Sequence, residues 1–226
     1  MQYMKLGRSG LKVSRLCLGC MTYADPAKAS HSWLIPEEDA QPFYQQAFEL
    51  GINFFDTANV YAGGSSEEVL GRAIRKYGRR EEVIITSKVY HQVRKDVNGK
   101  GLSRKAIITE AEKSLKRLNT DYIDIYQMHR YDPDTPLDET LRAFDDLVRA
   151  GKILYVGAST MFAWQLSKAI QMARYSGFGH IVLMQNHMNL LYREEEREMM
   201  GLCVEEGVAM TPWSPLARGR LTRPWK

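Results

Sequence analysis

Short apolar runs rich in β-forming residues alternate along the chain with longer amphipathic segments, and this alternation restricts the fold more than any other feature. Each run together with the segment after it has about the length of a βαβ repeat, in which a helix joins two parallel strands. Such an alternation permits either an open doubly wound sheet or a closed eight-stranded barrel. Seven strand-like runs are present, at residues 16–19, 53–57, 83–88, 122–129, 154–159, 182–185 and 209–213.

Local signals mark the boundaries of the predicted elements. Ser65 and Glu68 form a capping-box pattern before an apolar helical face that ends at Gly78. Near the N-terminus, two short β-forming runs at residues 3–6 and 11–13 flank a turn. We therefore expect a hairpin there, able to plug one end of a barrel.

The first run of the array does not carry the glycine fingerprint with which a dinucleotide-binding Rossmann unit opens. We therefore predict the α/β class, with a (β/α)8 TIM barrel preceded by the hairpin, as one domain over residues 1–226. Such a barrel needs an eighth strand and typically takes about 250 residues. We expect this sequence to stop after the seventh strand and to be part of a longer polypeptide.

Composition and charge exclude several classes of function. The chain is 44% hydrophobic and 26% charged, which is typical of globular proteins. Its formal charge of +4 is spread over mixed runs, so no nucleic-acid surface is expected. No apolar run approaches the roughly 20 residues that span a bilayer. Only three cysteines and no secretory leader are present, which favours a cytoplasmic protein.

The cysteine and histidine patterns do not predict a metal site. Cys17 and Cys20 form a C-x-x-C pair, but the strand context favours barrel packing for Cys17 and a loop position for Cys20. His180 and His187 have no matching set of ligands. The sequence leaves the oligomeric state open, a homo-oligomer included.

Polar side chains stand at the carboxyl ends of neighbouring predicted strands. Asp56 and then Tyr61 follow the second strand, Lys88 ends the third, and His129 ends the fourth. Each alone is more often a turn former, a solvated edge or a core residue. In a barrel, however, the carboxyl ends of the strands surround one mouth. A carboxylate, a phenol, an ammonium and an imidazole would then lie close together.

This set of groups suits proton transfer to an oxygen that is becoming an alkoxide. A buried ammonium beside a phenol stabilises the phenolate, so we expect Lys88 to lower the pKa of Tyr61. Asp56 would keep Lys88 charged, because an unpaired buried ammonium is costly. His129 could hydrogen-bond a substrate carbonyl and fix its angle.

The order of these motifs resembles the aldo-keto reductase family over nearly the whole chain. The stretches concerned are Asn53 to Ala58 with Tyr61 and Ser66 to Gly71, Thr86 to Lys88, and Asp121 to His129. The resemblance implies a catalytic tetrad that reduces an aldehyde or ketone, with Tyr61 as proton donor during hydride transfer from a reduced nicotinamide. Its members would be Asp56, Tyr61, Lys88 and His129.

The resemblance also implies a site for NADP(H). Ser159 and Gln185 would hold the carboxamide, Trp213 would stack on the nicotinamide ring, and residues 214–221 resemble a loop that covers the pyrophosphate. The family's pocket for the adenosine 2′-phosphate would lie beyond residue 226, so the choice between NADP and NAD cannot be read. The implied cofactor contacts are Gly19, Met21, Asp56, Ser159, Gln185, Trp213, Ser214, Leu216, Arg218, Gly219 and Arg220.

The stretches 185–187 and 190–196 resemble a particular branch, the bacterial reductases related to potassium-channel β subunits. The expected partner is a small carbonyl substrate whose identity the sequence does not give. Two other functions stay open. The chain could bind nicotinamide as a regulatory or redox-sensing subunit with little turnover, or Lys88 could form a Schiff base in an aldolase.

Overall fold

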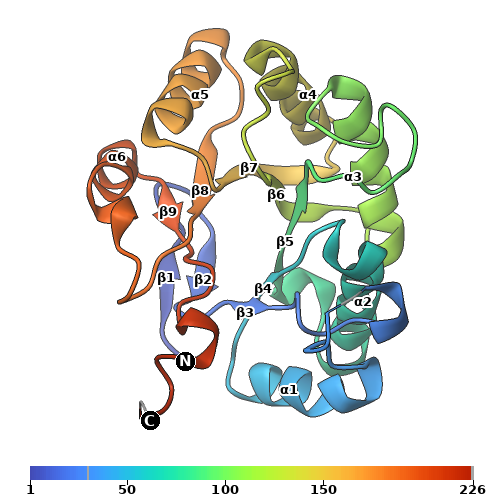
Figure 1. The fold of residues 1–226 in the computed structure, drawn as a ribbon. Helices are drawn as coiled ribbons and strands as arrows, with labels where there is room; N and C mark the ends of the chain where they lie inside the picture. The colour runs from blue at the N-terminus through green and yellow to red at the C-terminus, as the bar shows by residue number, and fades with distance from the viewer. Residues whose placement is uncertain (30, 225–226) are drawn as a thin grey trace.

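The computed structural model describes residues 1–29 and 31–224. Seven parallel strands lie side by side in chain order and form one curled sheet, with helices between them along the chain (Figure 1). The strands are β3 (Leu18–Gly19), β4 (Phe54–Asp56), β5 (Ile84–Val89), β6 (Ile123–Met128), β7 (Ile153–Ser159), β8 (Ile181–Gln185) and β9 (Ala209–Met210).

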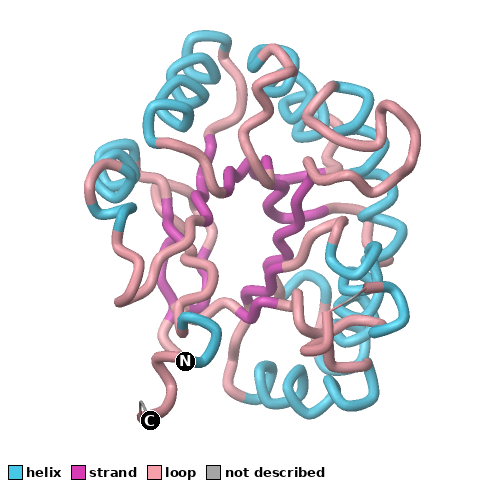
Figure 2. The backbone as a smooth tube through the Cα atoms, in the orientation of Figure 1, coloured by secondary structure: helices cyan, strands magenta, loops and turns pink. Residues whose placement is uncertain are grey.

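The helices cover the outside of this sheet, and Figure 2 shows the strands curving around a common axis within a ring of helices. Amphipathic sequence explains the arrangement, because each helix buries one apolar face against the strands and leaves the other in water. All six residues of β5 and all six of β6 are buried, as expected of strands covered on both faces. The helices are α1 (Glu37–Glu49), α2 (Ser65–Tyr77), α3 (Arg104–Leu118), α4 (Leu137–Arg149), α5 (Ala163–Ser176) and α6 (Met199–Glu206).

The predicted N-terminal hairpin is confirmed as the antiparallel pair β1 (Tyr3–Lys5) and β2 (Lys12–Ser14). Leu6 and Val13 are buried with residues from the inner face of the sheet, among them Phe54 at the start of β4. The hairpin thus packs near the amino ends of the strands. In Figure 1 it is the paler, more distant blue ribbon, so the viewer faces the carboxyl ends.

The predicted capping box at the start of α2 is wrong. The N-cap of this helix is Gly64, at φ 94°, and no side chain caps it. Ser65 lies inside the first turn, and its hydroxyl accepts a hydrogen bond from the backbone N–H of Asp25 at 2.8 Å. A tertiary contact therefore uses the group that the local pattern assigned to the helix.

The parallel α/β sheet with its hairpin agrees with the predicted architecture. Within the described residues, β3 and β9 form the two edges of the sheet and are not paired with each other, so the sheet is a partly closed barrel. No helix in the described part of the chain has the length and hydropathy needed to cross a membrane. The treatment of residues 1–226 as a single domain stays a prediction.

Candidate active site

A buried ion pair between β4 and β5 lies at the centre of the site. Lys88 is 0% exposed, and its Nζ donates to Asp56 Oδ2 at 2.7 Å. The same ammonium donates to the backbone oxygen of Thr57 at 2.8 Å and to the hydroxyl of Tyr61 at 3.2 Å. All three N–H donors of the lysine are therefore used, as a buried ammonium requires. The structure thus brings together three of the four side chains expected to form the tetrad.

Tyr61 reaches Lys88 because the chain makes an unusual turn directly after it. Ala62, Gly63 and Gly64 all have positive φ, at 46°, 60° and 94°. The positive φ of Gly64 favours glycine, and a Cβ added there would lie 2.6 Å from the side chain of Arg117, which would have to shift. This turn directs the tyrosine back over the strand ends.

The pKa of Tyr61 differs from the prediction. Burial raises the pKa of this phenol above its usual value, and the ammonium of Lys88 offsets only part of that effect. The predicted fall in pKa followed from the neighbouring charge alone, whereas the loss of hydration on burial acts in the opposite direction and is larger. Tyr61 therefore keeps its proton at neutral pH, which is the form that a proton donor must have.

The charge state of Lys88 reflects a similar competition with the opposite outcome. Burial favours the neutral amine, but the attraction of Asp56 and Tyr61 outweighs it and raises the pKa of Lys88. The side chain stays an ammonium at neutral pH. It can therefore stabilise negative charge that develops on the oxygen of Tyr61.

His129 follows β6 and stands edge-on to Tyr61, with the ring centroids 5.8 Å apart. Burial lowers its pKa, and the positive charge of Lys88 lowers it further. The imidazole is therefore neutral, and its buried Nδ1 has no hydrogen-bond partner among the described residues. A neutral imidazole can still offer one N–H to a carbonyl oxygen.

Two glutamines extend the hydrogen-bond network around Asp56. Gln185, from β8, donates its Nε2 to Asp56 Oδ1 at 2.9 Å, and Gln127, from β6, lies 3.5 Å from the same oxygen. Gln127 is not among the site residues predicted from the sequence. Its position two residues before His129 on a strand places both side chains on one face, and this alternation could have revealed it.

The side chains expected to hold a nicotinamide lie together at the ends of β7 and β8. Ser159 and Gln185 are paired residues of these strands, and both are buried. Trp213 donates its indole N–H to Thr160 Oγ1 at 3.0 Å. Thr160, at φ 43°, was not assigned from the sequence because the family often has asparagine there. The structure gives its hydroxyl a definite role in positioning the indole.

Trp213 is suited to stacking on a flat ring. One face of its indole covers His187, with ring centroids 4.1 Å apart and planes 13° apart. His187 in turn stacks on Tyr192 at 4.4 Å. This stack fixes the tilt of the indole, and Trp213 remains partly exposed to accept a planar group on its other face. The arrangement fits the stacking role expected of this residue.

Open space at the end of β3 and a basic loop complete the predicted cofactor contacts. A Cβ added to Gly19 would meet no atom within 4 Å, and Met21 is exposed. In the loop after β9, Ser214 and Arg218 have positive φ, and the charged ends of Arg218 and Arg220 are exposed. An exposed basic loop of this kind suits a phosphate. Leu216 and Gly219 belong to the same loop, where the amide of Gly219 donates to Leu216 at 3.0 Å.

The cysteines do not add chemistry to the site. All three are free thiols, and Cys20 lies in the loop directly after β3, as predicted, where it is fully buried. Burial raises the pKa of the Cys20 thiol to about 12, so it is unreactive at neutral pH. No group of three or more potential metal ligands occurs in the described part of the chain.

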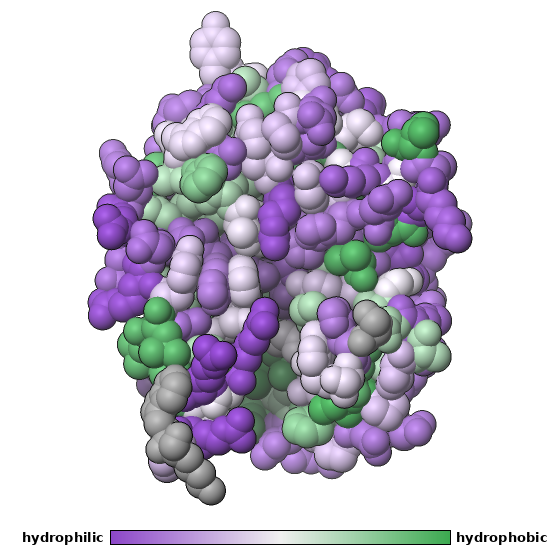
Figure 3. Space-filling view, viewed as in Figure 1, coloured by the Kyte–Doolittle hydropathy of each residue, from purple (hydrophilic) through white to green (hydrophobic). Residues whose placement is uncertain are grey.

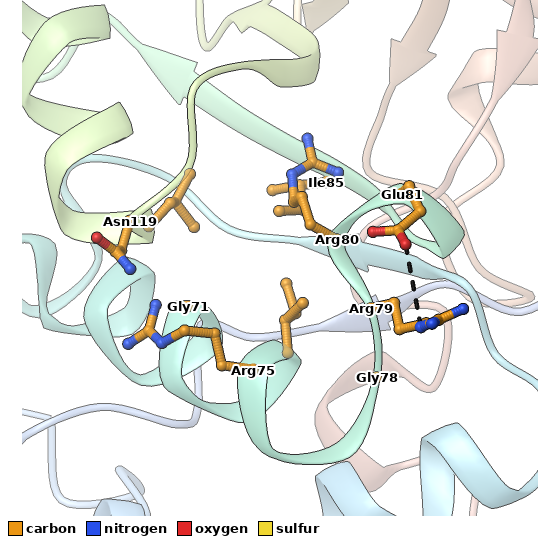
Figure 4. Close-up of a pocket in the computed structure, with 10 residues that line it drawn as sticks. Gly71, Arg75, Gly78, Arg79, Arg80, Glu81, Ile85 and Asn119 are labelled. Atoms are coloured by element: carbon orange, nitrogen blue, oxygen red, sulfur yellow. Dashed lines mark ion pairs between the residues drawn. The ribbon is translucent and has the colours of Figure 1, made fainter.

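A depression elsewhere on the molecule is unrelated to this site. It lies between the C-terminal end of α2, the start of β5 and the end of α3, and includes Arg75, Arg79 and Asn119 (Figure 4). Because α2 runs back from the carboxyl end of β4, this depression is near the amino ends of the strands. The face with the tetrad is the one in Figure 3, which is hollowed near its middle.

Comparison with known proteins identifies the family. Residues 15–224 match the aldo/keto reductase family. The versiconal hemiacetal acetate reductase of Aspergillus parasiticus is 42% identical over 100% of this chain and 70% of its own. An aldo-keto reductase of Fusarium vanettenii is 44% identical over 98% of this chain and 65% of its own. A Schizosaccharomyces pombe protein, provisionally named an aryl-alcohol dehydrogenase, is 45% identical over 96% of this chain and 68% of its own.

The chain spans about two thirds of the length of these relatives, as their 65–70% coverage shows. All three are fungal proteins, and they do not support the bacterial branch predicted from residues 185–187 and 190–196. The family match covers most of the residues, includes every member of the predicted tetrad, and agrees with the fold. The chain therefore belongs to the aldo/keto reductase family.

Proposed function

We propose that this protein reduces aldehydes or ketones to alcohols with NAD(P)H, and that Tyr61 supplies the proton. The observation that carries the proposal is the ammonium of Lys88 held between Asp56 and the hydroxyl of Tyr61, at 2.7 and 3.2 Å. Membership of a family that generally uses NAD(P)H supports the cofactor. The names of its relatives as reductases and aryl-alcohol dehydrogenases support the reaction.

In this proposal each residue has one task. A reduced nicotinamide, when bound, would supply the hydride that the carbonyl carbon accepts. Tyr61 donates its phenolic proton to the carbonyl oxygen, which becomes the alcohol, and Lys88 stabilises the phenolate that remains. Asp56 keeps Lys88 charged and in place. His129 donates a hydrogen bond to the same carbonyl oxygen and, being neutral, does not add a second positive charge beside Lys88.

The residues expected to bind the cofactor fit a nicotinamide dinucleotide. Ser159 and Gln185 would hold the carboxamide, and Trp213 would fix which face of the ring meets the substrate. Arg218 and Arg220 would hold the pyrophosphate. Kinship favours NADP(H) over NAD(H). The proposal includes a single domain over residues 1–226 and a cytoplasmic location.

The alternative of a Schiff-base aldolase fits the site less well. A lysine must be a neutral amine to attack a carbonyl carbon. Asp56 and Tyr61 raise the pKa of Lys88, so the nucleophilic form is scarce at neutral pH. The stacked Trp213 would also have no task in an aldolase.

The test is a Tyr61→Phe variant of the full-length protein, assayed by NADPH and NADH absorbance with a panel of aldehydes. Loss of a general acid typically lowers the rate by about 10²- to 10⁴-fold. We expect this loss in kcat, with cofactor affinity by calorimetry unchanged. Tyr175→Phe, at a tyrosine that is 95% exposed, is the matched control. Unaltered turnover in Tyr61→Phe would refute the proton donor, and cofactor binding without turnover in the wild type would favour a regulatory subunit.

A further inference from the structure

Arg130 is a half-buried guanidinium at the mouth of the site that the mechanism above does not use. It directly follows His129, and its Nη1 donates to the backbone oxygen of that residue at 2.7 Å. Burial lowers the pKa values of His91 and His129, and the positive charge of Arg130 lowers them further; the same charge offsets a small part of the rise in the pKa of Tyr61. The guanidinium is therefore held against the backbone of His129, whose ring packs edge-on to Tyr61.

Arg130 has no carboxylate partner among the described residues, unlike the other partly buried arginines of this chain. Arg80 pairs with Asp124 at 2.6 Å, and Arg117 pairs with Glu67 at 2.6 Å. Arg94 is held in the same way by Glu110. Each of these arginines has a structural task that its acidic partner explains. The single hydrogen bond of Arg130 goes to a neighbouring carbonyl and leaves most of its five N–H donors for another group.

The surroundings of Arg130 do not supply the missing negative charge. His91 packs edge-on to His129, with centroids 4.6 Å apart, and Tyr90 packs against His91. Lys100 lies 5.6 Å above the ring of Tyr90 and brings a second positive charge to the same wall. The carboxylate of Asp56 is already bound to Lys88 and Gln185. No ion pair joins Arg130 or Lys100 to a carboxylate within the described residues, and Asp132, two residues after Arg130, accepts its hydrogen bonds from Leu102, Asp134 and Thr135.

We propose that Arg130 binds an anionic group of the substrate, so that the protein prefers carbonyl compounds that carry a carboxylate. This inference rests on the function proposed above. A guanidinium presents two parallel N–H groups that match the two oxygens of a carboxylate. The rings of Tyr90, His91 and His129 pack on one another in that order, and the ring of His129 packs on Tyr61. A substrate whose carboxylate and carbonyl are separated by a flat ring fits that arrangement.

The experiment compares kcat/KM for 4-carboxybenzaldehyde and for its neutral analogue methyl 4-formylbenzoate, with full-length protein. The ratio of the two values in each variant is then compared with the wild-type ratio, so that the intrinsic reactivity of the aldehydes cancels. A hydrogen-bonded charge pair corresponds to about 10- to 100-fold. We expect Arg130→Met and Arg130→Gln to lower the ratio by that factor, mainly through KM for the acid.

Arg75→Met is the matched control, because it removes the same charge from an exposed arginine at the opposite end of the barrel. It should leave the ratio unchanged, which separates a local contact from the effect of net charge. An unchanged ratio in both Arg130 variants, with the neutral ester still reduced, would overturn this inference and leave the proposed function standing. Loss of NADPH affinity in Arg130→Met with an unchanged ratio would overturn it too, by assigning the residue to the cofactor. Failure of the wild type to reduce either aldehyde would overturn both proposals.

Discussion

Asp56→Asn would leave Lys88 buried without its counter-charge, and the cost can be worked from the structure. The ammonium is 0% exposed and would lose its only charged partner among the described residues, so that the acceptors left to it, such as the oxygens of Thr57 and Tyr61, are neutral. Removing one partner of a buried ion pair costs about 3–5 kcal/mol. The lysine can also escape by losing its proton. From a reference pKa of about 10.4, that release costs about 4.6 kcal/mol at pH 7, so the electrostatic penalty is limited to that size.

Because Lys88 can lose its proton, the loss of stability in Asp56→Asn should depend on pH in a definite direction. In the wild type, Asp56 raises the pKa of Lys88 in the folded state. The ion pair therefore stabilises the protein fully at pH values below the pKa of Lys88 in the unfolded state. This stabilisation is lost as the pH rises through the pKa of Lys88 in the folded state. In Asp56→Asn burial dominates and the folded pKa falls below the unfolded one. The unfolded state then binds more protons, and stability rises with pH. Between pH 7 and 9 the difference in the free energy of unfolding between the wild type and Asp56→Asn should shrink by up to about 2.7 kcal/mol.

Urea unfolding followed by circular dichroism at pH 7 and pH 9 measures both effects. The double variant Asp56→Asn/Lys88→Met is the control, because it removes both charges. It should be more stable than Asp56→Asn at pH 7 and should lose the added pH dependence. A difference in the free energy of unfolding between the wild type and Asp56→Asn below about 1 kcal/mol at pH 7 would refute the claim that Lys88 is a paired and fully buried ammonium. A difference that is equal at both pH values would refute it too.

Two further predictions concern Tyr61 and the turn that follows it. Because burial raises the pKa of Tyr61, kcat/KM for reduction should not fall between pH 6 and 9 through loss of the phenolic proton. A fall from that cause should appear only at higher pH. An apparent pKa below 9 in the rate profile that depends on Tyr61 would contradict this. Gly64→Ala should destabilise the protein by about 1–3 kcal/mol, because an L-residue there is strained at φ 94° and would clash with Arg117. Gly151→Ala has comparable φ, at 70°, but nothing within 4 Å of the added Cβ, so thermal unfolding should show a smaller loss.

Much of the fold could be predicted because the alternation of short apolar runs with amphipathic segments is a local property of the chain. The seven predicted strands overlap the observed ones, and the ends differ by a few residues. The largest difference is the last run, predicted to reach Trp213, where β9 ends at Met210. Trp213 instead forms a separate bridge to His187. A two-residue strand cannot be bounded by propensity alone.

The contacts of the site were less predictable than its residue types. Side-chain alternation could have placed Gln127 beside His129, but the bond between Gln185 and Asp56 depends on how far the sheet curls. The pKa of Tyr61 was wrong in direction because the sequence shows which charges are available and not how deeply each group is buried. The functional roles of the predicted site residues stay predictions until variants are measured.

Two of the hydrogen bonds to the carboxylate of Asp56, from Lys88 and from Gln185, become available at different times while the chain is being made. Its partner Lys88 is 32 positions away, whereas Gln185 is 129 positions away. Synthesis proceeds from the N-terminus at about 5–20 residues per second, so the lysine emerges several seconds or more before the glutamine. A nascent chain arrested between these two points would hold Asp56 and Lys88 without the cover of β8, accessible to water and to chaperones.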